Sequence, residues 1–219
     1  MRRAHLLGCL GLGLSTLAAC TPKLPAAKPP LFSDNFDRPD GLELGAAWQN
    51  TAPPGVYRIE GGALAVRGAH NHPLWLKREL PTDAVIELDA WSDSPDGDLK
   101  VEAFGDGKSY ALTLEYTSTG YVFIHGGWHN RLAALCRMEE HGEDRKTRGD
   151  LKVIPGRRYH YAIARHTTAQ GSRVEWFIDG QLALEMDDAA PLSGPGHQYF
   201  GFDNWETAVH FDNLVIRPY

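Results

Sequence analysis

Short segments in which apolar and polar residues alternate one by one recur along most of this chain. Val85 to Trp91 places three apolar side chains on one face, and Leu99 to Ala103 alternates in the same way. Successive side chains of a β-strand point to opposite faces, so this period of two predicts strands with one buried face. No long window has the 3.6-residue period of an amphipathic helix, and only Arg131 to Glu140 leaves room for a turn or two of helix.

Further alternating segments follow at intervals of about 10 to 15 residues, with Gly, Asp, Asn or Pro between them. Asp179-Gly180 is a signal for a type I′ hairpin turn. Short strands separated by turn residues are typical of antiparallel sandwiches, so we predict an all-β fold. Arg131 to Asp150 is the exception, and we expect a long charged loop there. The expected strands cover 85–91, 99–103, 110–116, 121–125, 159–165, 173–179, 182–186, 198–203 and 209–217.

Residues 1–19 have the composition of a signal peptide. Arg2 and Arg3 precede an apolar run, Leu6 to Ala19, which at about 14 residues is too short to span a bilayer. The run ends in Leu17-Ala18-Ala19-Cys20, which resembles the lipobox of bacterial lipoproteins. The resemblance implies cleavage before Cys20 and acylation of that residue. The alternative is an ordinary secretory signal in which the cysteine is a coincidence.

Residues 20–30 contain four prolines and predict an extended tether that leads from Cys20 to one domain over residues 31–219. Thr21 stands where lipoproteins of enterobacterial type that stay at the inner membrane have aspartate. The resemblance therefore implies a lipid-anchored protein of the cell envelope, at the outer membrane, with the membrane as a partner.

Charge and cysteine content argue against two classes of site. The chain has 22 basic and 28 acidic residues and no run of basic ones, so we do not expect it to bind nucleic acid. Cys9 would leave with the signal peptide and Cys20 would be acylated. Only Cys136 then remains, which predicts neither an internal disulfide nor a thiolate zinc site. We expect Cys136 to be a small buried side chain.

Several segments, in this order, resemble the concanavalin A-like jelly roll of laminin-G and glucanase domains. The resemblance implies a sandwich of two antiparallel sheets, a fold that serves lectins, binding modules and glycosidases alike. The segments are Phe32–Asp37, Trp48, Tyr57–Leu64, Leu74–Lys77, the strand of Glu87, Trp176–Gln181 and Phe211–Ile216.

Within this superfamily, Gly61-Gly62-Ala63-Leu64 and Leu74-Trp75-Leu76-Lys77 look similar to the 3-keto-disaccharide hydrolase domains. The chain differs from them after Trp91, where Asp96-Gly97-Asp98-Leu99-Lys100 replaces an Asn-Ser-Gly segment. Family-16 glucanases carry Glu-x-Asp followed by a second glutamate. Glu87 and Asp89 match the first two positions, but no second glutamate follows, so we expect these two on a solvated sheet face.

Two histidine-containing loops are candidates for a site. His70 and His72 lie in one of them, and His125 and His129 lie near the end of a predicted strand. If both loops meet at one rim, the imidazoles could bind a transition metal or supply a general base. The alternative is a set of separate loop histidines that bond to the backbone.

The tryptophans divide into two groups by their neighbours. Trp48, Trp75 and Trp176 lie in apolar strands, and we expect them in the core. Another group has Gly, Asp, Asn or His beside it, a mixture that stacks on sugar rings and bonds to their hydroxyls. Ordinary packing is the alternative. The expected ligand-binding residues are Trp91, Trp128, Trp205, Asp203, Asn204, His70, His72, His125 and His129.

Acidic segments on the first and last predicted strands offer oxygen ligands for a structural Ca²⁺, namely Asp34, Asn35 and Asp37 with Asp212 and Asn213. No other cofactor is expected. We therefore predict a lipid-anchored, lectin-like domain that binds carbohydrate or a cell-envelope glycan. The alternatives are a glycoside-cleaving enzyme that resembles the keto-sugar hydrolases, in which the four histidines converge on one pocket, and a structural lipoprotein without a small ligand.

Overall fold

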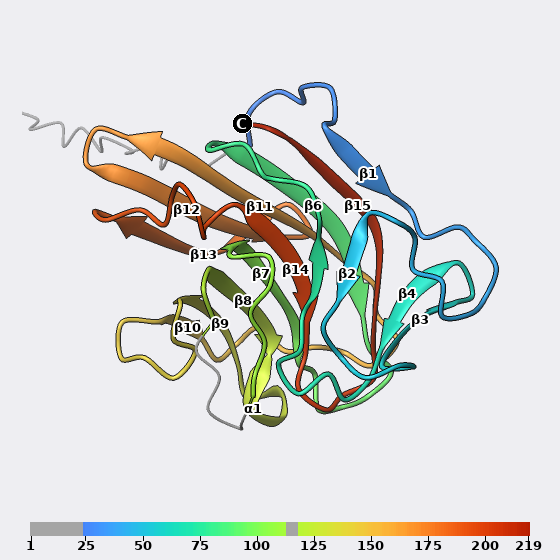
Figure 1. The fold of residues 1–219 in the computed structure, drawn as a ribbon. Coiled ribbons are helices and arrows are strands. Elements are labelled where there is room, and N and C mark those ends of the chain that lie inside the picture. Colours follow the sequence, from blue (N-terminus) through green and yellow to red (C-terminus); the bar gives the residue numbers. More distant parts are fainter. Residues whose placement is uncertain (1–23, 113–117) are drawn as a thin grey trace, which may run out of the picture.

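Two antiparallel sheets stacked face to face make up the part of the chain that the structure describes, residues 24–112 and 118–219 (Figure 1). The structure is a computed structural model. Sheet I contains, in spatial order, β3 (Tyr57–Glu60), β4 (Ala63–Val66), β15 (Val209–Pro218), β6 (Ala84–Trp91), β11 (Tyr159–Thr168), β12 (Gly171–Ile178) and β13 (Gln181–Asp188), with β1 (Phe32–Asp34) also paired to β15.

Sheet II consists, in spatial order, of β2 (Trp48–Asn50), β5 (Leu74–Leu76), β14 (Tyr199–Asp203), β7 (Leu99–Gly105), β8 (Tyr121–Gly126), β9 (Leu132–Arg137) and β10 (Lys146–Arg148). A single helical turn, α1 (Gly127–Asn130), joins β8 to β9. Strands that are neighbours in a sheet are often distant in the chain, as in β14 beside both β7 and β5. This arrangement confirms the predicted all-β, two-sheet jelly-roll sandwich.

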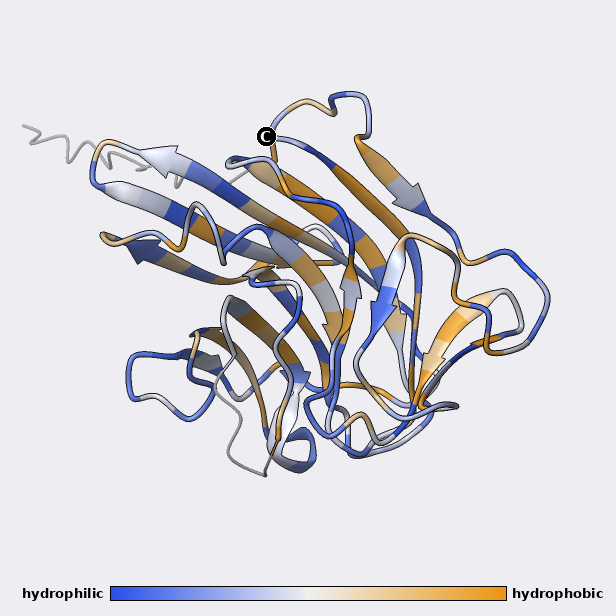
Figure 2. Cartoon of the chain, viewed as in Figure 1, coloured by the Kyte–Doolittle hydropathy of each residue, from blue (hydrophilic) through white to orange (hydrophobic). Residues whose placement is uncertain are grey.

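The core lies between the two sheets and follows the predicted alternation (Figure 2). The inward side chains of β6, Ile86, Leu88 and Ala90, are fully buried. Trp48 and Trp176 belong to this core, as predicted. Asp179 and Gly180 have φ angles of 51° and 76°, and two successive positive values define the type I′ turn that the sequence indicated.

Trp75 is also fully buried, but on the opposite face of sheet II. A Cβ atom on Gly105 or Gly201 would lie within 3 Å of the Trp75 ring, so the indole lies flat across these two glycines. Its Nε1 donates to the carbonyl of Ser109, 3.0 Å away. Loops therefore cover part of the outer face of sheet II, and polar side chains on that face can be buried.

Two expectations about secondary structure were wrong. The charged loop expected over 131–150 contains β9 and β10, and no helix occupies Arg131 to Glu140 beyond the end of α1. Ala133 and Leu135 face the core, while Ala134 and Cys136 are buried on the other side of sheet II. A strand buried on both faces does not alternate, which is why the pattern was missed. In the strand expected at 110–116, Tyr110, Ala111 and Leu112 lie outside any strand, and residues 113–117 lie outside the described residues.

The tether reaches the domain at the end of sheet I where the chain also terminates (Figure 1). Leu31 N donates to the carbonyl of Ile216 at 2.8 Å, and Lys28 Nζ donates to the carbonyl of Tyr219. Within the described residues, no helix has the length and apolar character needed to cross a bilayer. The predicted signal peptide and Cys20 lie outside the described residues.

Candidate functional site

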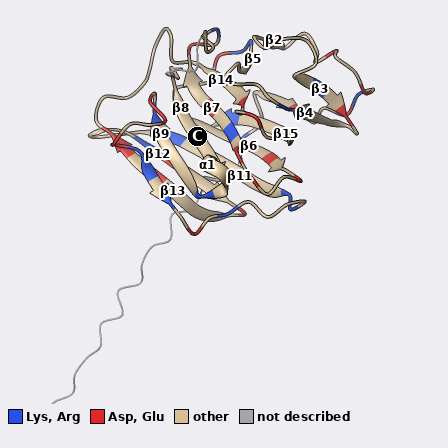
Figure 3. Ribbon diagram, turned by 90° about the horizontal axis from the view of Figure 1, so that it is seen from below, with Lys and Arg blue, Asp and Glu red and all other residues tan. Residues whose placement is uncertain are grey.

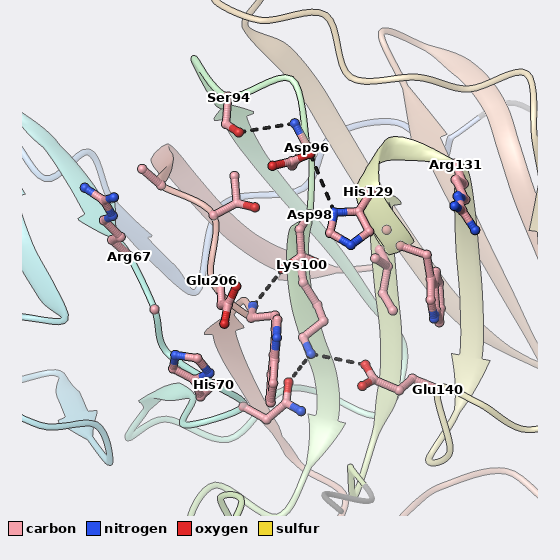
Figure 4. A pocket seen from close by; sticks show the side chains of 18 of the residues that line it. Arg67, His70, Ser94, Asp96, Asp98, Lys100, His129, Arg131, Glu140 and Glu206 are labelled. Carbon is pink, nitrogen blue, oxygen red and sulfur yellow. Dashed lines mark hydrogen bonds and ion pairs between the residues drawn. The ribbon is translucent and has the colours of Figure 1, made fainter. Parts of the chain in front are cut away.

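A cleft of about 970 Å³ opens at one end of the sandwich (Figure 4). Its walls come from the loops after β4, β6, β8 and β14, which lie at one end of the sheets, and from the connection between β9 and β10. This connection leaves β9 at the opposite end and folds back over the outer face of sheet II, where Cys136 Sγ meets the Glu140 carbonyl. The residues that line it are Arg67, Gly68, His70, Asn71, Ser94, Asp96, Asp98, Lys100, Ile124, Gly127, Trp128, His129, Arg131, Glu140, His141, Trp205, Glu206, Thr207 and Ala208.

The floor of the cleft is built around a buried lysine on β7. Lys100 projects from the outer face of sheet II and is 3% exposed. Its Nζ lies 3.1 Å from Glu140 Oε2 (Figure 4). It also lies 3.2 Å from Asp203 Oδ2 and donates to Asn71 Oδ1. Burial alone would lower the lysine pKa, but the carboxylates of Asp203, Glu140 and Asp98 raise it well above its usual value. Lys100 is therefore a permanent cation.

Asp203 and Asn204 hold the loops together beneath the cleft. Asp203 accepts from the Asn204 backbone N–H at 2.9 Å through Oδ1, so both of its carboxylate oxygens have partners. Asn204 is fully buried, and its Oδ1 accepts from the Ala69 N–H at 3.1 Å. Burial raises the Asp203 pKa to about 6, although Lys100 opposes this shift. These two predicted ligand-binding residues thus support the walls from below.

One wall is aromatic and comes from the loop after β14. Trp205 is half-buried, and its ring meets that of His70 edge to face at a centroid distance of 4.7 Å. Backbone bonds fix this pair, because His70 N donates to the Trp205 carbonyl at 2.9 Å. The Trp205 N–H in turn donates to Asp98 Oδ2 at 2.7 Å. Burial raises the pKa of Asp98 above its ordinary value.

The opposite wall is the turn α1. Trp128, His129 and Asn130 have φ angles of 53°, 58° and 57°, a left-handed conformation that L-residues rarely adopt and that costs each about 1–2 kcal/mol. The Asn130 side chain holds the turn, since its Oδ1 accepts from Val153 N and its Nδ2 donates to Val153 O, both at 2.8 Å. Trp128 is half-buried, and the Arg145 guanidinium lies 5.2 Å above its ring.

A second buried carboxyl group stands next to this site on β7. Glu102 is 1% exposed, and its Oε1 accepts from the backbone N–H groups of Thr119 and Gly120 at 2.8 and 2.6 Å. Burial, together with the charge of Asp203, raises the Glu102 pKa to about 7. The outer face of sheet II therefore carries two carboxyl groups that titrate near neutral pH, and such shifts are concentrated at functional sites.

The predicted residues fall into three groups. His70, His129, Trp128 and Trp205 line the cleft, and Asp203 and Asn204 lie beneath it. The remaining three residues, His72, His125 and Trp91, do not line it.

His72 bonds through Nδ1 to the Thr51 carbonyl at 3.0 Å and stacks on Tyr110. His125 is buried in the core, 2.8 Å from the Tyr161 hydroxyl. Since these two lie away from the cleft, the four histidines do not converge on one pocket. Trp91 stacks on His210 on the outer face of sheet I.

The candidate metal ligands are engaged with protein groups. Asp34 accepts from Trp48 Nε1 at 2.9 Å and pairs with Arg38, and Asp212 pairs with Arg158. The first and last strands do lie side by side, since β1 pairs with β15. Among the residues that the structure describes, no three histidine, cysteine or acidic side chains gather in a way that could hold a metal ion.

Glu87 and Asp89 lie on the outer face of sheet I, at a distance in the fold from the cleft. Asp89 is bound by Arg158 Nε at 3.1 Å and by His160 Nδ1 at 2.9 Å, and Glu87 pairs with Arg217. They form the polar sheet face that the sequence indicated. Cys136 is buried as predicted, and burial raises the pKa of its thiol to about 12, which keeps it protonated at neutral pH.

Sequence reasoning missed most of the residues that line the cleft, among them Asn71, Asp98, Lys100 and Glu140. Asp98 carried a signal, because it follows Gly97 in a short polar loop, and Asn71 lies between the two predicted residues His70 and His72. In the structure both adopt positive φ angles, 61° for Asn71 and 69° for Asp98. Lys100 gave no signal, since a lysine that alternates with Leu99 and Val101 is typical of an exposed strand face. Its burial depends on loops that are distant in the sequence.

Comparisons with solved structures find proteins that share the jelly-roll fold. A carbohydrate-binding module from Bacillus subtilis aligns over 78% of this chain and 95% of its own, with 12% identity and a TM-score of 0.56. An alginate lyase in complex with an alginate trisaccharide aligns over 88% and 100%, with 15% identity and a TM-score of 0.57. An endo-1,3-β-glucanase from Streptomyces sioyaensis aligns over 89% and 98%, with 11% identity and a TM-score of 0.59.

No protein-family model and no curated protein sequence matches the chain. The similarity to these structures therefore concerns the fold, which by itself does not determine function.

Proposed function

We propose that this chain binds carbohydrate in the cleft, as an extracytoplasmic domain held at a membrane by a lipid on Cys20. The observation that carries the proposal is the pair of half-buried indoles, Trp128 and Trp205, on two walls of one cleft whose floor is polar. An indole face packs against the apolar face of a sugar ring, and neighbouring carboxylate and amide groups bond to the hydroxyls.

The cost of building the cleft supports a ligand-binding role. Three successive left-handed residues in α1 and a buried lysine among carboxylates are both expensive to fold. An apolar floor of the same shape would cost less free energy to fold. Ligand binding therefore explains these features better than a contribution to stability does. The names of the three similar structures describe a carbohydrate-binding module, a lyase with a bound trisaccharide and a glucanase, which also supports a sugar as ligand.

The test is a glycan array with the soluble domain, followed by calorimetric titration of the best oligosaccharide. Trp128→Ala and Trp205→Ala should each weaken binding by about tenfold, the loss of one stacking contact. Trp91→Ala is the matched control, since Trp91 lies on the outer face of sheet I and its removal should leave affinity unchanged. The proposal fails if no glycan binds, or if all three variants bind like the wild type.

A second candidate function is cleavage of the bound glycan. It is favoured by two carboxyl groups, Asp98 and Glu140, that line the same cleft in different surroundings. Burial raises the pKa of Asp98, which suits a proton donor, whereas Glu140 lies 3.1 Å from the Lys100 ammonium and would take the role of the base. Asp98→Asn should then still bind the array sugar but release no reducing ends from it. Wild-type protein that binds and never cleaves would leave binding as the function.

The membrane anchor rests on the resemblance of residues 17–20 to a lipobox, and it is tested separately. Wild-type protein should take up labelled palmitate and fractionate with membranes. Cys20→Ala should take up no label and should retain its signal peptide, about 19 residues longer than the processed form. A wild-type protein that is soluble and unlabelled would mean that the chain is merely secreted.

A further inference from the structure

The Lys100 side chain connects three parts of the chain that form the cleft. Its ammonium binds oxygens from three separate segments, namely the loop after β4, the connection between β9 and β10, and β14. Asn71 and Asp203 are 3% and 2% exposed, and the Glu140 side chain is 17% exposed. Carboxylate oxygens and amide carbonyls are also the ligands that proteins use to hold a calcium ion. Here a lysine nitrogen occupies the centre of such a ligand set.

We propose that Lys100 is the internal cation of the cleft, which fixes the walls without a metal ion and leaves a floor suited to uncharged, hydroxyl-bearing sugars. This inference rests on the proposed carbohydrate-binding function. It makes Lys100 a positioning residue, because the side chain acts on the ligand through the groups that it holds.

The choice of ligand follows from the protons of the ammonium group. A lysine has three N–H donors and no acceptor, and those of Lys100 go to Asn71, Glu140 and Asp203. No cationic donor is therefore left at the floor for an anion. The second oxygen of Glu140 is 3.7 Å from His141 Nε2, and Asp98 Oδ1 has no bond within the described residues. Both oxygens can accept from sugar hydroxyl groups, and the Glu140 carboxylate repels a carboxylate of the ligand.

Cations do occur at the rim. Arg67 and Arg131 are exposed on opposite sides of the cleft and have no ion pair within the described part of the chain (Figure 4). They lie away from the Lys100 network, so they can meet an anionic substituent only outside the floor. A preference of the whole cleft for acidic sugars would place the recognition at this rim instead and would contradict the inference.

The first experiment compares neutral and uronic-acid oligosaccharides of equal length on one array, with and without EDTA. We expect the neutral sugars to bind at least about tenfold more tightly and EDTA to have no effect. Loss of binding in EDTA, or a tenfold preference for uronic acids, overturns the inference. If no oligosaccharide of either class binds, the proposed function itself fails.

The second experiment uses variants of the network with the best neutral oligosaccharide. Lys100→Met should abolish measurable binding, and near-ultraviolet circular dichroism checks its fold. Glu140→Gln keeps a carbonyl for Lys100 but turns an N–H₂ group toward the ligand, so affinity should fall about tenfold while the melting temperature stays near that of the wild type. Glu185→Gln is the control and should bind normally, because it breaks only the ion pair between Glu185 on β13 and Arg173 on β12.

Glu140→Gln decides the case if Lys100→Met does not fold. Wild-type affinity in Glu140→Gln, with the control also unchanged, would show that sugars bind elsewhere in the cleft, and the role of Lys100 would be rejected while carbohydrate binding stood.

Discussion

Glu102, on β7, carries a buried carboxyl group that can ionise. It is 1% exposed, and burial raises its pKa to about 7, while bonds from Thr119 and Gly120 oppose that shift. In the unfolded chain the group titrates near its ordinary value of 4.5. Between these two pH values the folded protein binds a proton that the unfolded chain has lost, so stability contributed by the neutral carboxyl falls as the pH rises from 4.5 to 7.

Glu102→Gln should remove this pH dependence. The amide oxygen can still accept the N–H bonds of Thr119 and Gly120, and the side chain no longer ionises. Relative to the variant, the wild type should lose about 3 kcal/mol of unfolding free energy between pH 4.5 and 8, since each unit of pKa shift is worth about 1.4 kcal/mol. Urea denaturation of both proteins across this range measures the difference. A constant difference would mean that Glu102 titrates normally.

His125 should give the opposite slope. It is 1% exposed on the inner face of β8, and burial lowers its pKa from 6.5 to about 4. The unfolded chain therefore binds the extra proton between these values, and stability is lost as the pH falls from 6.5 to 4. Between pH 6.5 and pH 4 the wild type should therefore lose about 3 kcal/mol more unfolding free energy than His125→Gln. Equal slopes for the two proteins in urea would contradict the shifted pKa.

Burial of polar residues on sheet II is the feature that the sequence predicted least well. Lys100 and Glu102 alternate with Leu99, Val101 and Ala103, and this pattern correctly predicted which side chains face the core. The same pattern cannot say whether the other face meets water or a covering loop. Asn71 and Glu140, which complete the Lys100 network, are 29 and 40 residues away in the chain.

At the scale of elements, alternation identified the strands that have one covered face and failed where both faces are covered. β6, β7, β11 and β15 lie within about three residues of their predicted bounds. β9 was missed because its residues pack on the core with one face and beneath the 138–145 connection with the other, where Cys136 Sγ meets the Glu140 carbonyl at 3.8 Å.

Substitution of two glycines by alanine tests whether the cleft needs the close backbone contact between Gly97 and Gly126. Gly97 has φ 71°, and a Cβ there would lie 2.5 Å from the Gly126 carbonyl oxygen, between the loop of Asp98 and the start of α1. Gly61, in the turn between β3 and β4, has φ 60° and nothing within 4 Å of such a Cβ. Gly61→Ala should cost about 1 kcal/mol, the penalty of a left-handed alanine. Gly97→Ala should cost about 3 kcal/mol because a backbone displacement is added.

The two variants should also differ in binding. Gly97→Ala displaces Asp98 and α1, so affinity for the array sugar should fall, whereas Gly61→Ala should bind like the wild type. Denaturation and titration of the same protein samples give both quantities. Similar losses of stability for the two variants would show that the contact between Gly97 and Gly126 relaxes without strain.

At the scale of the whole molecule, basic and acidic residues are interspersed over the described strands and loops (Figure 3). Charges of opposite sign face each other across β12 and β13 (Figure 3), where Arg173 on β12 pairs with Glu185 and Asp187 on β13. This mixture agrees with the expectation that nucleic acid is not a partner, which stays a prediction. The positions of the tether and the cleft differ more clearly, because they occupy different ends of the sandwich.

The ends are separated by the length of β15. Thr207 and Ala208, which line the cleft, precede this strand, and its far end pairs with β1 and carries the tether contact of Lys28 with Tyr219 (Figure 1). Ten extended residues span about 33 Å. If Cys20 carries the lipid, the membrane therefore lies beyond the end opposite the cleft, and the cleft opens toward ligands away from that membrane.

This orientation predicts that anchoring leaves the site accessible. The lipidated protein reconstituted on liposomes should bind a soluble polysaccharide, of the type selected on the array, with the affinity of the anchor-free domain. The polysaccharide should be too large to enter the gap between the domain and the bilayer, so that a cleft facing the lipid would be blocked. Co-sedimentation of labelled polysaccharide with the liposomes measures binding, and Trp205→Ala on the same liposomes is the control for adsorption to lipid. Weaker binding by the anchored form than by the free domain would place the cleft against the membrane and refute the geometry inferred from β15.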